Sequence, residues 1–224
     1  MCGATAANAQ TIQNFDSGWY QNNGFTAGVS NINVGSSNLS GAIYNNYLAF
    51  NLAGLANQNI TSATLTFYGG NGVNTSLTSE TLGLFDYKGS INALLSDQSS
   101  VGVFTDLGNG NSYGTAVVAA GPIQQFSIVL SAAAIADLNF AAHNNPADTR
   151  FVIGGSLSSI SGPFANEQLF AIFGPQTALT PAAALNLATV AVPEPTSWAM
   201  LLTGFGLMGF AIRRRKATAR IRFA

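Results

Sequence analysis

Alternating hydrophobic and polar positions run through most of the first 192 residues and predict β-strands. Leu48, Phe50 and Leu52 occupy every second position of one segment, and Leu65 and Phe67 do the same in the next. Because successive residues of a strand point to opposite faces of a sheet, each segment has one face suited to a hydrophobic core. The strands expected on this basis cover residues 44–52, 60–68, 81–87, 101–105, 123–130, 150–155, 168–173 and 184–190.

Glycine-rich segments separate these strands, and one further segment has helical spacing. The expected turns lie at 69–72, 108–111, 121–122 and 162–163, where Gly, Asn and Pro favour turn conformations. Over 131–142, Ile135, Leu138 and Ala142 are spaced for an amphipathic helix that Ser131 caps. Short strands, frequent turns and one short helix predict an all-β fold: an antiparallel β-sandwich of jelly-roll type over residues 10–190.

The charge distribution divides the chain into a body and a tail. Only 8% of the residues are charged, against about 25% in an average soluble domain. Six of the eight Lys and Arg residues lie in the last 12 positions. Before Pro193, Lys88 and Arg150 face eight acidic residues, so the body carries a net charge of −6. A body so poor in cations has no surface for phosphates, which argues against a nucleic-acid partner.

The N-terminus resembles the end of a secretory signal peptide. Residues 1–9 end in Ala7-Asn8-Ala9, a small-x-small cleavage pattern, although the charged and apolar parts of such a peptide are missing. We interpret residues 1–9 as a signal-peptide remnant and Gln10 as the first mature residue. An Ala-rich disordered N-terminus is the alternative. Cys2 is the single cysteine, so no intramolecular disulfide can form.

Candidate chemistry in the body is sparse. His143 has no second histidine to share a zinc site, and no Gly-x-Ser-x-Gly nucleophile elbow occurs, so we expect His143 at a helix C-terminus. Arg150 beside Asp148 predicts a local ion pair. No cofactor is expected. A structural calcium ion stays open, although no Asp-x-Asp-x-Asp run supports it.

Glycosidase activity and sugar binding both need residue types that this chain contains, but no sequence spacing identifies which of these residues would act together. A glycosidase needs two opposed carboxylates, and nothing in the spacing of the acidic residues selects a pair. Sugar binding needs exposed aromatic rings, whereas most aromatic residues of a sandwich lie in its core. The acidic residues of the body are Asp16, Glu80, Asp86, Asp97, Asp106, Asp137, Asp148 and Glu167. The candidate aromatic residues are Trp19, Tyr20, Phe25, Tyr44, Tyr47, Tyr68, Tyr87 and Tyr113.

The tail contains three consecutive parts. After a linker over 191–197 with a Pro-Glu-Pro motif, the 15 residues from Trp198 to Ile212 carry no charge, and a basic segment over 213–224 follows. As a helix, 15 residues extend about 22 Å, short of the roughly 20 residues of a typical membrane span. Thr196 and Ser197 can lengthen it, and arginines can reach the interface. We therefore expect a transmembrane helix over 198–212, a cytoplasmic basic tail and a periplasmic body.

A Gly-x-Gly-x-x-Gly pattern within this segment does not indicate a dinucleotide site. It covers Gly204 to Gly209, but prolines rather than a strand precede it. Only 15 residues follow it, too few for the rest of a βαβ unit. Small residues in such a helix instead allow close helix packing.

The order of these parts resembles the PEP-CTERM sorting signal, in its Pro-Glu-Pro-x-x-Trp-Ala form. The resemblance implies recognition by exosortase, a membrane-embedded, cysteine-dependent enzyme of the transpeptidase type. It also implies a Gram-negative host with exopolysaccharide machinery. Residues 217–224 extend beyond the usual end of the signal. The sorting residues implied are Pro193, Glu194, Pro195, Trp198, Ala199, Arg213, Arg214, Arg215 and Lys216.

The expected function is therefore that of an exported, non-enzymatic protein of the envelope or extracellular matrix, associated with exopolysaccharide or biofilm. Its C-terminal helix would hold it in the inner membrane until exosortase acts, after which it would reach the cell surface or matrix. A carbohydrate-binding adhesion protein is the alternative. A secreted hydrolase has less support.

Overall fold

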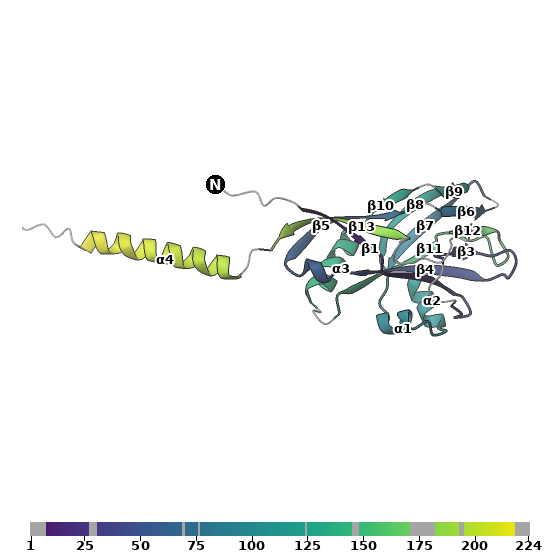
Figure 1. Cartoon of the computed structure of the whole chain (residues 1–224), viewed down its shortest axis with the longest axis horizontal. Coiled ribbons are helices and arrows are strands. Elements are labelled where there is room, and N and C mark those ends of the chain that lie inside the picture. Colours follow the sequence, from purple (N-terminus) through teal and green to yellow (C-terminus); the bar gives the residue numbers. More distant parts are fainter. Residues whose placement is uncertain are drawn as a thin grey trace, which may run out of the picture. The chain divides into compact units, whose positions relative to one another are not determined.

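The computed structural model describes residues 8–26, 31–68, 70–75, 77–123, 125–144, 148–170, 182–192 and 195–217 (Figure 1). The chain divides into two compact units, Met1–Val190 and Ala191–Ala224. Residues 1–7 of the expected signal-peptide remnant lie outside the described residues, while Asn8 and Ala9 pair with Thr189 and Ala188.

In the described part of the first unit there are two β-sheets, and every pairing with a defined register is antiparallel. The four-stranded sheet has the order β1 (Asn8–Gln13), β13 (Ala183–Ala191), β5 (Gln58–Phe67), β10 (Phe126–Val129). The nine-stranded sheet has the order β8 (Ser112–Ala119), β7 (Ser79–Asp86), β11 (Arg150–Leu157), β4 (Ile43–Asn51), β3 (Val34–Ser36), β12 (Glu167–Leu169), β6 (Gly70–Thr75), β9 (Gly121–Ile123). Strand β2 (Asp16–Gln21) also pairs with β4.

Both sheets contribute to the main hydrophobic core. Leu48 and Phe50 of β4 enter it together with Leu65 and Phe67 of β5, so the faces expected from the alternating pattern are confirmed. The predominantly β, antiparallel character is confirmed as well. The jelly-roll sandwich stays a prediction.

Helix α3 (Ala132–His143) forms where the sequence predicts it. The Ser131 side chain accepts a hydrogen bond from the Ala134 backbone N–H at 3.4 Å and so caps the helix. Near the start of β5, the Asn139 side chain accepts a hydrogen bond from Ile60 N at 2.8 Å and donates one to Ile60 O at 2.9 Å. Asn139 thus occupies the position of a further strand residue and attaches α3 to β5.

The strand expected over 101–105 is wrong, because these residues belong to helix α2 (Val101–Leu107). Ser100 caps this helix by accepting from Val103 N at 3.2 Å, and the buried Val103 and Leu107 lie four residues apart. A second unexpected helix, α1 (Ile91–Leu95), begins after Ser90 in the same way, and a 3-10 turn, η1, covers Ala53–Leu55. One short helix was therefore too few.

Helices α1 and α2 lie together beside β4, where they cover the second face of the larger sheet (Figure 1). A small core forms there from residues including Tyr47, Leu107 and Val152. Gly154 allows this packing, because a Cβ at that position would lie 2.4 Å from the Leu107 carbonyl oxygen. Strands β4 and β11 are consequently buried on both faces, as is typical of strands between two layers.

Other strand predictions are confirmed with shifted ends. Of the strand expected over 168–173, β12 covers Glu167–Leu169, and 171–173 lie outside the described residues. The turns expected at 69–72 and 121–122 are wrong in part, because β6 and β9 pair there with a register shift between Gly70 and Val73. Glycine allows such irregular pairing as readily as it allows a turn.

The second unit contains helix α4 (Pro195–Ala217). None of the helices in the described part of the chain combines the length and the apolar character that crossing a membrane requires. The prediction of a transmembrane helix over 198–212 is therefore corrected. Its uncharged stretch stops at Ile212, and the helix continues into Arg213, so the apolar part gains no length from the extra turns.

Candidate functional site

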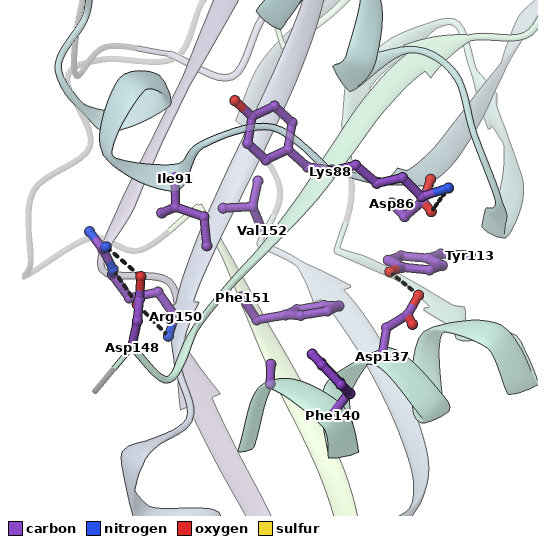
Figure 2. Close-up of a pocket in the computed structure, with 12 residues that line it drawn as sticks. Asp86, Lys88, Ile91, Tyr113, Asp137, Phe140, Asp148, Arg150, Phe151 and Val152 are labelled. Carbon is purple, nitrogen blue, oxygen red and sulfur yellow. Dashed lines mark hydrogen bonds and ion pairs between the residues drawn. The ribbon is translucent and has the colours of Figure 1, made fainter. Parts of the chain in front are cut away.

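A pocket of about 350 Å³ lies in the first unit, between the end of β7, strands β8 and β11, and helix α3 (Figure 2). Figure 2 shows polar groups at two opposite ends of the pocket and apolar side chains between them. The lining residues are Asp86, Tyr87, Lys88, Ile91, Tyr113, Asp137, Phe140, Ala141, Asp148, Arg150, Phe151 and Val152. The structure thus brings three of the eight acidic residues into one pocket.

Asp86 is buried at one end of the pocket and organises the connection from β7 to β8. Its Oδ1 accepts from the Asn111 backbone N–H at 2.8 Å, and its Oδ2 accepts from the Asn111 side chain at 3.1 Å and from Lys88 Nζ at 3.0 Å. Gly110 has a φ of +101°, and a Cβ there would lie 2.0 Å from Asp86 Oδ1. This carboxylate is therefore surrounded by donors from the two ends of the connection between β7 and β8.

Tyr113 forms part of the pocket floor next to Asp86. Its ring stacks on Phe151, with centroids 5.9 Å apart and planes at 16°, and its hydroxyl donates to Asp137 Oδ2 at 2.8 Å. Burial raises the pKa of Tyr113, and the hydrogen bond to Asp137 raises it further. The phenol therefore stays protonated and remains a donor to Asp137.

The opposite end of the pocket holds the ion pair expected from the sequence. Arg150 Nε donates to Asp148 Oδ1 at 2.6 Å, and Nη2 donates to Asp148 Oδ2 and to Asn92 Oδ1, each at 2.7 Å. The hydrogen bonds from Arg150 lower the pKa of Asp148, and the carboxylate in turn raises the pKa of Arg150. Asp148 is therefore ionised at neutral pH and has no proton to donate in catalysis.

We expect the Asp148–Arg150 pair to make stability depend on pH in acid. Because the pKa of Asp148 is lower in the folded state, its contribution is complete above the unfolded value of 3.8 and is lost as the pH falls through the folded pKa. The side chains are about 30% exposed, so less than about 1 kcal/mol is at stake. Urea unfolding of wild type and Asp148→Asn at pH 7 and pH 3 should show the larger loss for wild type. Arg150→Gln should flatten the profile equally, and a profile unchanged by both variants would contradict the assignment.

The candidate aromatic residues differ in how far they are exposed to solvent. Tyr20, Tyr47 and Tyr113 are buried, so these rings cannot form a sugar-binding surface. Phe25 is exposed and packs against a half-buried Trp19, with ring centroids 6.1 Å apart. Trp19, Tyr44, Tyr68 and Tyr87 are half-buried.

Phe140 is one of several apolar pocket residues that no sequence pattern singled out. It lies on α3 outside the buried positions Ala134, Leu138 and Ala142, and 65% of its surface is exposed. A large aromatic residue on the polar face of an amphipathic helix is a signal that the sequence does contain.

His143 ends helix α3, as expected, and its Nε2 lies 2.8 Å from the Gln58 carbonyl oxygen of β5. In the described residues, no group of three or more His, Cys, Asp or Glu side chains could hold a metal ion.

The expected sorting residues lie at the start and the end of α4. Pro195 is the first residue of the helix, Trp198 and Ala199 follow in its first turns, and Arg213 to Lys216 precede its end at Ala217. Fifteen residues of helix separate Trp198 from Arg213 by about 22 Å. Proline suits the first helical position, and cations near the C-terminus complement the helix dipole. Pro193 and Glu194 lie outside the described residues.

Residues 191–216 match a family model described as the PEP-CTERM protein-sorting motif. The tail carries a PEP-CTERM sorting signal. No curated protein matches the chain. The signal supports an exported protein that is sorted by exosortase, a membrane enzyme, as the resemblance of the tail implied.

The PEP-CTERM signal and the pocket belong to different compact units. The signal makes the chain a substrate of exosortase and says nothing about chemistry in the body. Any function of the body therefore has to be inferred from the pocket and the surface of the first unit.

Proposed function

We propose that this chain is a non-enzymatic protein of the cell surface or extracellular matrix that exosortase sorts through the PEP-CTERM signal. The observation that carries the proposal is the match over residues 191–216, which follows a β-rich body with few charged residues. A jelly-roll sandwich is the architecture we propose for that body. No active-site residue is needed for this role, because the signal is read by another protein.

The arrangement of charged groups in the pocket supports a role other than catalysis. Asp86 is surrounded by Asn111 and Lys88, and Asp148 is held by Arg150. A glycosidase of the usual kind needs one carboxylic acid that can donate a proton and a second carboxylate opposite it. Two of the three pocket carboxylates are instead neutralised by neighbouring cations.

Sorting should be lost when the Pro-Glu-Pro motif is removed. We expect Pro193→Ala/Glu194→Ala/Pro195→Ala to abolish delivery to the surface or medium in a host with exosortase, because the enzyme recognises the motif. Fractionation followed by intact-mass measurement of the protein in each fraction checks this and reports both chain ends.

Thr196→Ala/Ser197→Ala is the matched control, because these two residues occupy the variable positions between the prolines and Trp198. The control should be sorted like wild type. Sorting that is unchanged in the triple variant, or equal with and without exosortase, would defeat the proposal.

Binding of matrix polysaccharide by the body is a second candidate function, and it would retain the protein after sorting. The observation that favours it is the exposed ring of Phe140 beside a pocket that has polar groups at both ends.

A further inference from the structure

The pocket beside α3 combines an apolar centre with two polar ends. Phe151 and Val152 of β11 are buried at its centre, and Phe140 approaches from α3 (Figure 2). Asp137 lies at one end and Arg150 at the other. Pockets that bind small ligands are typically lined by apolar and aromatic side chains with a few placed polar groups, and 350 Å³ falls within their usual range.

The charges of the pocket argue against an anionic ligand. Both cations in the lining have a carboxylate partner within the lining: Lys88 Nζ lies 3.0 Å from Asp86 Oδ2, and Arg150 Nε lies 2.6 Å from Asp148 Oδ1. A phosphate or carboxylate would have to compete with these partners and would also approach Asp137. Desolvating such an anion without a cation of its own is unfavourable.

The exposed ring of Phe140 offers an apolar face to a ligand in the pocket. The side chain is 65% exposed, although α3 buries its apolar residues on the opposite side. Contacts within the protein hold the floor below, where Tyr113 stacks on Phe151 and donates to Asp137. A flat ligand that covers Phe140 would remove apolar surface from water without rearranging the protein.

Asp137 can accept a hydrogen bond from such a ligand. Among the described residues, Tyr113 donates a hydrogen bond to Oδ2 of Asp137 at 2.8 Å. An ionised carboxylate has several acceptor sites, so Oδ1 can accept from a hydroxyl group. The planar Arg150 guanidinium at the other end offers donors to hydroxyl oxygens, in addition to those bound to Asp148 and Asn92.

We propose that this pocket binds a neutral sugar residue of a polysaccharide, with its C–H face on Phe140 and its hydroxyl groups directed to Asp137 and Arg150. Sugars combine an apolar face with a polar edge and carry no charge, which is the combination that this lining provides. The site deepens the proposed polysaccharide-binding function and rests on it. The proposed role is binding without cleavage, since Asp148 is held as a carboxylate by Arg150 and Asp86 is paired with Lys88.

The test is native gel electrophoresis of the purified full-length chain in gels that contain a soluble neutral polysaccharide. The three polysaccharides are a β-glucan, a mannan and a galactan, and binding is measured as slower migration. We expect at least one of them to retard wild type, and Phe140→Ala to weaken that binding at least tenfold. Asp137→Asn should weaken it several-fold, while its side-chain oxygen still accepts from Tyr113. Thermal unfolding of each variant separates a loss of binding from a loss of fold.

Phe164→Ala is the matched control, because Phe164 is 63% exposed and does not line the pocket. It should bind like wild type. Retardation by none of the three neutral polymers overturns the proposal, as does preferential retardation by alginate or heparin, or an equal loss in the Phe140 and Phe164 variants. Sorting is measured separately in cells, so a protein that is sorted but does not bind refutes this inference alone.

Discussion

Replacing Gly35 by alanine is expected to destabilise the first unit by about 3 kcal/mol or more. Gly35 lies in β3 with a φ of +117°, a conformation that costs other residues roughly 1–3 kcal/mol. A Cβ there would also lie 2.0 Å from the Glu167 carbonyl oxygen and 2.9 Å from Leu157 Cδ1. Because Glu167 belongs to the paired strand β12, the backbone itself would have to move, at a further cost of about 1–3 kcal/mol.

Gly121→Ala separates the two causes. Gly121 has nearly the same φ, +113°, but a Cβ built there meets nothing within 4 Å. It should therefore show the conformational cost without the steric one. Chemical denaturation of both variants measures the difference in the free energy of unfolding. Equal losses would mean that the contact between β3 and β12 is not as close as the structure has it.

Asp86→Ala is expected to cost about 2–4 kcal/mol. The Asp86 side chain is buried, and its removal takes away two hydrogen bonds that Asn111 donates to a charged group. Each is worth about 1.5–3 kcal/mol, and the exposed Asn111 recovers part of this by binding water. The connection that leads into Tyr113 would loosen, so the pocket floor would lose order. Denaturation gives the free energy, and near-ultraviolet circular dichroism reports the tyrosine environment.

Lys88→Ala tests the other end of the same contact. Lys88 Nζ lies 3.0 Å from Asp86 Oδ2, but the lysine side chain is 66% exposed, so its removal should cost less than about 1 kcal/mol. We expect the Asp86 variant to lose more stability than the Lys88 variant, because Asp86 is buried and Lys88 is exposed. A loss in the lysine variant as large as that of Asp86→Ala would contradict this account.

Local patterns predicted those elements whose burial follows a single period. Leu65 and Phe67 of β5 alternate towards the core, and Ser131 with Leu138 and Ala142 predicted α3, because each element packs its large apolar residues against the core from one face. The same reasoning failed at 101–105, where alternation suggested a strand although Ser100 and the spacing of Val103 and Leu107 indicated a helix. Residues 101–107 therefore carried both a strand-like and a helix-like pattern, and packing against the sheet favoured the helix.

The pocket could not be predicted from spacing. Asp86, Asp137 and Arg150 come from β7, α3 and β11, and the pairing of β7 with β11 together with the packing of α3 brings them to one place. In the sequence, several other acidic residues are equally plausible as members of a binding site. Phe140 was missed because a helical pattern identifies the residues that face the core, and Phe140 is an apolar residue on the exposed face.

The sequence alone determined the sorting signal, because its recognition elements are consecutive and their order is itself the message. It also determined the antiparallel β character of the body, since alternation follows directly from strand geometry. Only the tertiary structure decided which charges pair, which aromatic rings are buried and where Phe140 lies. Those properties depend on contacts between residues far apart in the chain, and a period of two or 3.6 residues carries no information about such contacts.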